Sequence, residues 1–187
     1  CLLLLLPLAV MAQPGGSLQD LLKQARSRSA WERYTAMQSL AYHAEGHPEV
    51  AAALLAGLRD TEALVRRGAA AGLLQAPRLP AALDPLLAIL RDPDPEVRAA
   101  VAETLGYYGD TRALAPLREL LKDQDAKARA GAVAGLGRLP RRDPDARAWG
   151  REIPDLLLAA TGDPDPAVRA KAAEYLGYLR VARAEER

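Results

Sequence analysis

A short motif rich in aspartate and proline recurs along this chain in a fixed register. Asp-Pro-Asp-Pro-Glu-Val-Arg at residues 92–98 returns as Asp-Pro-Asp-Pro-Ala-Val-Arg at residues 163–169, and weaker copies lie at 60–66 and 123–129. In every copy an arginine follows the first acidic residue by six positions, and a leucine follows that arginine by seven. Copies of one motif in a fixed register indicate a repeat protein. A single repeat unit cannot bury its apolar face alone, so neighbouring units must stack against one another.

The spacing of these arginines predicts five units. An earlier copy keeps the same spacing with Ser27 in place of the aspartate. The arginines at positions 33, 66, 98, 129 and 169 are therefore separated by 33, 32, 31 and 40 residues. The long last interval indicates an insertion of roughly eight or nine residues, which repeat arrays place in loops. We divide the chain into units at about 17–45, 46–77, 78–109, 110–140 and 141–187.

Each unit is predicted to be a hairpin of two helices. The first, the A helix, is an apolar stretch before the turn, with a leucine such as Leu117 six residues ahead of the turn residue. In the second, the B helix, Val97, Val101 and Leu105 recur at helical spacing and form a stripe for burial. The side chain of Asp94 can cap this helix by accepting a hydrogen bond from its first N–H groups. A proline follows at the first helical position, where a missing N–H costs nothing. The pattern predicts an all-α, right-handed solenoid of about five hairpins.

The residues available for the core favour close packing between helices. Half of the residues are hydrophobic, yet the sequence contains no phenylalanine. The interior must therefore consist of Leu, Val and Ala, which suit short helices stacked side by side. Glycines near the ends of the B helices either terminate those helices or admit a close neighbour; they are Gly106, Gly137 and Gly177.

Charge and composition exclude several classes of function. Lys and Arg together number 25 and Asp and Glu 24, a formal net charge of +1, whereas binding to nucleic acid or anionic membranes requires a basic excess. The single cysteine, Cys1, allows no intrachain disulfide. His43 and His47 are the only histidines, and no His-Glu dipeptide recurs between units, so we expect no metal site. With no phosphate-binding loop or catalytic triad pattern, we also expect no cofactor and no catalysis.

The first residues have the pattern of an export signal. Residues 1–12 are uninterruptedly apolar, but they are too short for the roughly 20 residues of a membrane span. Val10 and Ala12 fit the small residues required before a cleavage point at Gln13. We interpret 1–12 as the remnant of a signal peptide and 13–16 as a leader, which predicts an exported protein, periplasmic or extracellular, with no stable span after cleavage. Acylation of Cys1 is the alternative, although five leucines follow it directly.

The turn motif, followed by an alanine-rich helix that ends in Leu-Gly, resembles the HEAT-like repeats of the phycobilisome-lyase type. The resemblance covers about residues 17–187. It implies a hydrogen-bonded ladder in which turn aspartates and B-helix arginines of successive repeats pair, and the first repeat, with Ser27, would be an atypical cap. Such charges satisfy one another and are structural rather than catalytic. The ladder residues are Asp60, Asp92, Asp123, Asp163, Arg66, Arg98, Arg129 and Arg169.

In arrays of this kind the B helices line the concave side, so their outward residues are the candidates for binding. These lie two, six and ten positions after Val97 and its equivalents, and they form an exposed stripe that begins at Ala99 in the third unit and at Ala130, followed by Ala134, in the fourth. Tyrosine and arginine anchor protein interfaces because both are large and amphipathic, and tyrosine also has few rotatable bonds to immobilise. The tyrosines have a second interpretation, in which they only cover the edge of the next repeat. The candidate residues for binding a protein or peptide are Tyr34, Tyr42, Glu103, Tyr107, Arg138, Glu174 and Tyr178.

The insertion adds one further candidate. Residues 138–151 combine several arginines with Trp149, a composition that suits an acidic or aromatic segment of a partner. Alternatively, Asp143 and Asp145 offset the arginines and Trp149 packs beneath the loop.

The sequence thus predicts a non-catalytic, protein-binding scaffold. The alternative, implied by the resemblance to lyases, is attachment of a bilin chromophore to a partner protein. A third function, that of a HEAT-like DNA glycosylase, is disfavoured by the net charge of +1.

Overall fold

The computed structural model describes residues 16–139 and 152–185. The predicted signal remnant at 1–12, residues 13–15 of the leader, and Trp149 with most of the insertion lie outside the described residues. Within the described ranges the chain forms α-helices and three short 3-10 turns, and it contains no strand.

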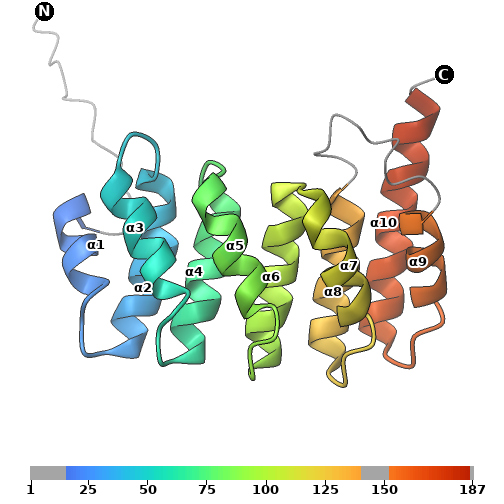
Figure 1. Ribbon diagram of the computed structural model, residues 1–187, viewed down its shortest axis with the longest axis horizontal. Helices are drawn as coiled ribbons and strands as arrows, with labels where there is room; N and C mark the ends of the chain where they lie inside the picture. Colours follow the sequence, from blue (N-terminus) through green and yellow to red (C-terminus); the bar gives the residue numbers. More distant parts are fainter. Residues whose placement is uncertain (1–15, 140–151, 186–187) are drawn as a thin grey trace, which may run out of the picture.

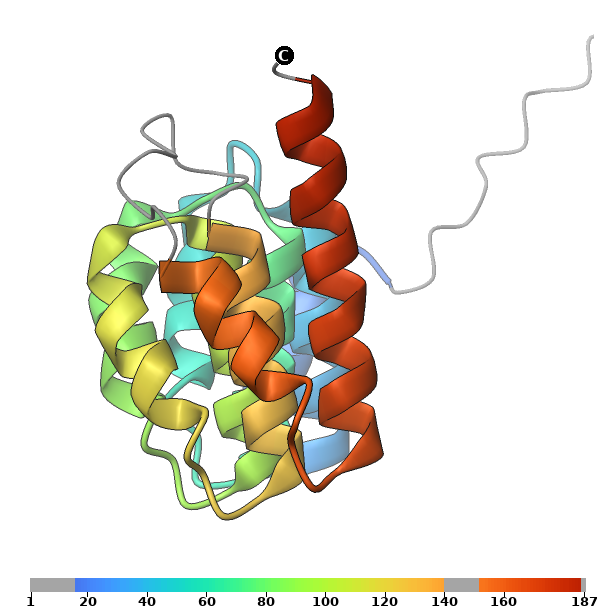
Figure 2. The same cartoon turned by 90° about the vertical axis from the view of Figure 1, so that its right-hand side faces the viewer.

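Ten α-helices of the described chain pair into five hairpins that stand side by side in one row (Figure 1). Seen along that row, the A helices form one layer and the B helices the other (Figure 2). The prediction of an all-α solenoid is therefore confirmed. The A helices are α1 (Leu18–Gln24), α3 (Pro48–Gly57), α5 (Leu83–Ile89), α7 (Leu114–Leu120) and α9 (Glu152–Ala160). The B helices are α2 (Ala30–Leu40), α4 (Ala63–Gln75), α6 (Pro95–Tyr108), α8 (Ala126–Arg138) and α10 (Pro166–Glu185).

The two edges of the row differ in how their connections are built. All five turns that lead from an A helix to its B helix contain five residues, 25–29, 58–62, 90–94, 121–125 and 161–165. The connections from a B helix to the next A helix vary, from 109–113 to 139–151. They include the 3-10 turns Ala41–His43, Pro80–Ala82 and Thr111–Ala113.

Aspartates fix where the B helices begin. The Asp94 carboxylate accepts hydrogen bonds from the backbone N–H groups of Glu96 (2.8 Å) and Val97 (3.1 Å), ahead of the first turn of α6. Asp125 accepts likewise from Lys127 N (2.7 Å) at the start of α8. These bonds satisfy N–H groups that have no partner inside the helix. At its other end α6 terminates at Gly109, whose φ of 66° lies in the left-handed region.

The core runs along the row between the two layers. The A-helix leucines Leu54, Leu86, Leu117 and Leu157 are fully buried, as are Val97, Val101 and Leu105 of α6. The last B helix departs from the prediction, because Leu176 and Leu179 are only partly buried there and Tyr175 occupies the buried position instead. The helix α10 packs against α8 and α9, and among the described residues no further hairpin covers its other side.

Helices α6 and α8 pack with their backbones in contact. A Cβ added at Gly106 would lie 2.3 Å from the carbonyl oxygen of Gly135, and one added at Gly135 would lie 2.4 Å from that of Ala102. Gly137 similarly accommodates the ring of Tyr175. Since α6 continues past Gly106 to Tyr108, that glycine serves close packing rather than helix termination.

The structure contains no helix, within the described residues, with the length and hydropathy required to cross a membrane.

Candidate functional site

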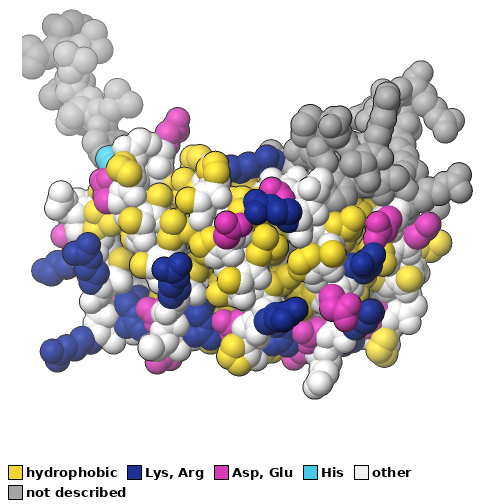
Figure 3. Space-filling model, viewed as in Figure 1, with side chains coloured by type: hydrophobic (Ala, Val, Ile, Leu, Met, Phe, Trp, Pro, Cys, Tyr) yellow, Lys and Arg dark blue, Asp and Glu magenta, His cyan; other side chains and the backbone are white. Residues whose placement is uncertain are grey.

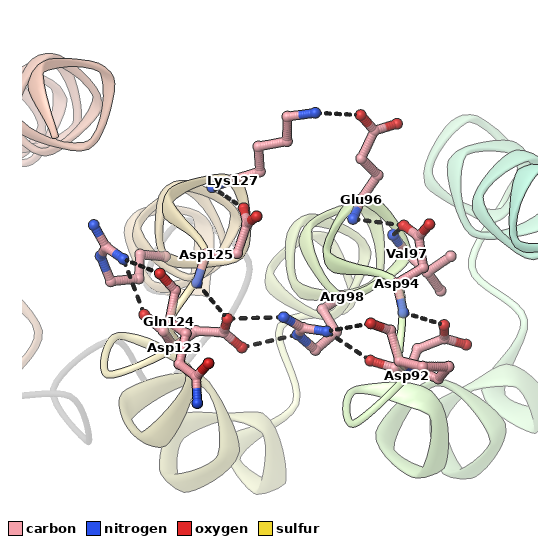
Figure 4. A network of polar contacts seen from close by, with 11 residues as sticks. Asp92, Asp94, Glu96, Val97, Arg98, Asp123, Gln124, Asp125 and Lys127 are labelled. Atoms are coloured by element: carbon pink, nitrogen blue, oxygen red, sulfur yellow. Dashed lines mark hydrogen bonds and ion pairs between the residues drawn. The ribbon is translucent and has the colours of Figure 1, made fainter.

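The edge formed by the A-to-B turns carries a repeated ion pair, and Arg98 illustrates it (Figure 4). Arg98 donates from Nε and Nη2 to the two carboxylate oxygens of Asp123 in the next hairpin, both at 2.8 Å. Its Nη1 donates to the carbonyl oxygens of Asp92 (2.7 Å) and Pro93 (3.1 Å) in its own turn. One planar guanidinium therefore holds its own turn and the following one in a fixed relation.

The same rung occurs at each of the four junctions between described hairpins. The N–O distances of these bidentate pairs lie between 2.7 and 2.9 Å. The first rung uses Arg33, which we did not include in the predicted ladder, although its spacing from Ser27 matched that of the other arginines. The pairs are Arg33–Asp60, Arg66–Asp92, Arg98–Asp123 and Arg129–Asp163.

The two ends of the ladder are different from its interior. At the first turn Ser27 bonds to Glu32 and accepts from Ser29 N (3.1 Å), so it offers no carboxylate to an arginine. At the last turn Arg169 Nη1 donates to the carbonyl oxygens of Asp163 and Pro164, both at 2.8 Å. Its Nε and Nη2 bond to no carboxylate of the described chain.

The ladder pairs are largely shielded from solvent. The side chains of Arg66 and Asp92 are only 13% and 5% exposed. The bond from Arg33 lowers the pKa of Asp60. Burial by itself would raise the pKa of Asp92, but the Arg66 guanidinium and the Asp94 backbone N–H hold it below its ordinary value. The pKa of Asp123 and that of Asp163 are lowered by their arginines in the same way. The charges thus compensate one another, as a structural ladder requires.

We expect the protein to lose stability in acid. The unfolded carboxyl groups titrate near their ordinary pKa of about 3.9, whereas the folded pKa values of the four ladder aspartates are lower. A lowered folded pKa gives stability that is complete above the unfolded pKa and is lost as the pH falls towards the folded one. Urea unfolding should therefore give equal free energies at about pH 7 and 5 and a smaller one at about pH 3. The Asp92→Asn variant has one titrating ladder carboxylate fewer, so its free energy of unfolding should fall less on acidification than that of the parent protein.

The face of the B helices is hollowed over α2, α4, α6 and the start of α8. We call this depression of about 410 Å³ the B-face hollow. Arg67 lies 5.7 Å from the centre of the Tyr34 ring, within range of a cation–π contact. Gln38 donates from Nε2 to the Tyr34 hydroxyl at 2.8 Å. The hollow is lined by Tyr34, Gln38, Arg67, Ala71, Leu74, Glu96, Ala99, Ala100, Glu103 and Lys127.

Acidic and basic groups alternate around the B-face hollow. Glu96 bonds to both Arg67 and Lys127, so it links three successive B helices. Glu103 accepts from Arg138 Nη1 at 3.1 Å, and the guanidinium of Arg78 lies 5.7 Å from the centre of the Tyr107 ring. Of the predicted binding residues, the structure thus brings Tyr34 and Glu103 into the hollow, with Arg138 bonded to Glu103.

The other candidates lie elsewhere. Tyr42 is in a 3-10 turn after α2, not on a B helix as predicted, and is 76% exposed. Glu174 and Tyr178 lie exposed on α10, where Glu174 pairs with Lys171. Ala134, which we placed on the exposed stripe, is 1% exposed, because α8 is packed between α6 and α10.

Sequence reasoning missed Glu96 and Lys127. Each lies three residues before the first position of the predicted stripe, which is Ala99 in α6 and Ala130 in α8. Extending the stripe by one helical turn towards the helix start would have included both.

The histidines lie near the α2–α3 connection. His47 Nδ1 lies 3.0 Å from Glu49 Oε1. No cluster of three or more His, Cys, Asp or Glu side chains suited to a metal ion occurs in the described part of the chain.

Figure 3 shows the A-helix side, where apolar surface lies between scattered charges and most charged side chains gather towards the edge with the A-to-B turns.

Comparison with known proteins agrees with this geometry. The family model for HEAT repeats matches residues 18–91 and 83–149. The chain belongs to the HEAT-repeat family. No curated protein matches the sequence.

Solved structures share the fold of these HEAT repeats. One is the complex of CpcE and CpcF of phycocyanin lyase from Nostoc sp. PCC7120, with 22% identity and a TM-score of 0.69 over 88% of this chain. This chain spans 66% of the length of that lyase chain. A designed armadillo repeat protein in complex with the peptide (KR)4 aligns over 86% of this chain and 80% of its own, at 19% identity and a TM-score of 0.60.

Proposed function

We propose that this HEAT-repeat protein is a non-catalytic scaffold that binds an extended peptide segment of a partner protein in the B-face hollow. The observation that carries the proposal is the convergence of Tyr34, Arg67 and Glu103 from three different B helices on one depression. A long segment can contact several helices at once there, and repeat solenoids present such continuous surfaces.

The lining indicates the chemistry of the segment. The Tyr34 ring is a rigid anchor for an apolar or cationic side chain. Glu96 and Glu103 can accept hydrogen bonds from basic groups, while Arg67 and Lys127 can pair with acidic ones. Because these charges already pair within the protein, a partner must replace bonds rather than fill vacant ones, which favours selectivity over affinity.

The fold comparisons support binding without identifying the partner. The lyase structure is a complex of two chains, and the designed armadillo protein is in complex with a peptide. Both are similar to this chain in fold.

Filling the B-face hollow should weaken binding. Ala71 lines the hollow, and the indole of Ala71→Trp would occupy the space of an anchoring side chain. We would select peptides from a random displayed library on the immobilised protein and measure their affinity by fluorescence polarisation. Ala71→Trp should weaken the selected peptides at least about tenfold, the effect of losing one anchor.

The matched control is Ala88→Trp, which places the same side chain at an exposed site on the A helix α5. It should leave peptide affinity unchanged. Both variants must retain the circular dichroism spectrum and melting temperature of the parent. Peptides that bind Ala71→Trp as well as the parent, or a library that yields no binder, would contradict the proposal.

Attachment of a bilin chromophore is the second candidate, and the similarity in fold to the lyase complex favours it. Mixing the protein with a bilin and recording the visible spectrum separates the two. The scaffold proposal expects no shift in absorbance, whereas a stable shift would favour the chromophore function.

A further inference from the structure

Trp31 extends the B-face hollow beyond the residues that line it. Its side chain is 62% exposed, and its ring centre lies 5.4 Å from that of Tyr34, which lines the hollow. Like Glu96 and Lys127, Trp31 lies two residues before the ladder arginine of its B helix. Equivalent positions of stacked repeats face the same side, so Trp31 borders the same surface. A large exposed aromatic side chain beside a hollow is suited to anchor a partner.

The edge of the hollow that includes Trp31 changes in character along the row. The residues at this repeat position are Trp31 in α2, the half-buried Leu64 in α4, Glu96 in α6 and Lys127 in α8. The first half of the edge is therefore apolar and the second half is charged. A segment that lies along the row must match both halves.

Cations outnumber carboxylates in the charged half. Glu96 bonds to both Arg67 and Lys127, and Glu103 bonds to Arg138, so two carboxylates are shared among three cations. Figure 4 shows the Lys127 ammonium group directed at Glu96. A cationic side chain of a partner would compete for carboxylates that are already paired and would be repelled by the surplus charge. A carboxylate of a partner would be attracted to it.

Arg67 is not bound as the ladder arginines are. It donates to Glu96 from Nη1, whereas Arg66 holds both carboxylate oxygens of Asp92 through Nε and Nη2, at 2.7 and 2.8 Å. The bidentate arrangement is the stronger one. A partner carboxylate that binds Arg67 in this arrangement would therefore make a better bond than the one it replaces. The displaced Glu96 is partly exposed and can turn to solvent.

The distance between the helices sets the spacing of residues within the segment. Packed helices lie about 8 to 10 Å apart, and an extended chain advances about 3.3 Å per residue. Each B helix therefore corresponds to about three residues of the segment. Trp31 in α2 and Glu96 in α6 are two B helices apart, so residues that contact their positions are separated by about six residues.

We propose that the segment bound in the B-face hollow is acidic. One of its carboxylates takes the place of Glu96 between Arg67 and Lys127. About six residues away, an apolar or aromatic side chain packs on Trp31 and Tyr34. This inference rests on the proposed function, because it specifies the ligand of the same surface.

Two displayed peptide libraries test the charge of the segment. Both encode apolar and aromatic residues, but one adds only Asp and Glu and the other only Lys and Arg. Each is selected on the immobilised protein, and weaker binding to Ala71→Trp identifies the peptides that use the hollow. The hollow-dependent peptides from the acidic library should bind at least about tenfold more tightly than any from the basic library.

The variant Glu96→Gln changes affinity in opposite directions for the two kinds of segment. It removes the carboxylate that an acidic peptide must displace, so acidic peptides should bind about threefold more tightly, the effect of one exposed ion pair. A basic segment would lose an acceptor and bind more weakly. A defect in folding cannot produce the expected gain in affinity.

Two further variants locate the contacts, each with a matched control. Arg67→Gln should weaken acidic peptides at least about tenfold, as expected for losing a charge-assisted bidentate bond. Arg118→Gln also removes an arginine that pairs with the next hairpin, at Glu152, but on the A-helix side, and it should leave affinity unchanged. Trp31→Ala should weaken the same peptides about tenfold. Leu158→Ala, at an equally exposed site on the A helix α9, should not.

Four outcomes would overturn the proposal. They are hollow-dependent peptides of equal or higher affinity from the basic library, weaker binding of acidic peptides by Glu96→Gln, equal effects of Arg67→Gln and Arg118→Gln, and no effect of Trp31→Ala. In each of them peptides still bind in the hollow, so the proposed function stands. Only peptides that bind Ala71→Trp as tightly as the parent, or the absence of binders from both libraries, would contradict both proposals together.

Discussion

Replacing Gly135 by alanine should destabilise the folded protein by about 2 to 3 kcal/mol, the usual cost of inserting a methyl group into a tightly packed contact. The new Cβ would lie 2.4 Å from the carbonyl oxygen of Ala102 and 3.1 Å from its carbonyl carbon. Both are backbone atoms, which cannot rotate away as a side chain would. Helices α6 and α8 must therefore separate. The gain of about 1 kcal/mol in helix propensity offsets only part of this cost.

Gly177→Ala is the matched control, since it makes the same change at a helical glycine with open space around it. Only the gain in propensity acts there, so this variant should be more stable than the parent by roughly 0.5 to 1 kcal/mol. Urea unfolding followed by circular dichroism measures both. Equal effects of the same sign at the two sites would show that backbone contact between α6 and α8 does not determine the stability of the stack.

Asp92→Ala is expected to cost about 3 kcal/mol, the lower part of the range for breaking a buried ion pair. The loss arises because the Arg66 side chain, which is 13% exposed, would keep its charge without a carboxylate. The backbone N–H of Asp94, which donates to Asp92 at 2.9 Å, would also lose its acceptor. The variant should unfold at lower urea concentration and at a lower temperature.

Asp84→Ala removes a carboxylate that also bonds to an arginine of the next hairpin, Arg112, but is 82% exposed. It should change stability by no more than a few tenths of a kcal/mol, as for other exposed pairs. The double variant Arg66→Met, Asp92→Leu should recover most of the loss, because apolar replacements leave no buried charge. If Asp92→Ala and Asp84→Ala have similar effects, the ladder does not stabilise the junctions.

The repeats made the hairpins and the ladder predictable from the sequence. The ladder arginine near the start of each B helix and the leucine seven residues after it recur in all five hairpins, so local sequence was sufficient to predict them. Arg33 could be added by the same spacing, even though Ser27 replaces the acid in its own turn.

Contacts across repeats were harder to predict, because a helical stripe does not specify how far each neighbour covers it. Ala134 is at the same repeat position as Glu103, but its short side chain is 1% exposed, whereas the longer side chain of Glu103 is 36% exposed and bonds to Arg138. Glu96 bonds to Arg67 and Lys127 through long side chains from adjacent helices. Such pairing depends on rotamers and helix spacing that no single repeat encodes.

The A-to-B turns all have the same length, whereas the connections on the other edge vary. The two edges of the row should therefore differ in how well they tolerate inserted residues. A guanidinium of fixed size spans neighbouring turns on one edge, so an added residue there would shift a carboxylate out of register and break a rung. The other edge already accommodates connections of 5 to 13 residues. New loops, tags or binding segments can therefore be grafted between a B helix and the next A helix with little strain, whereas the ladder edge cannot be extended without the loss of a rung.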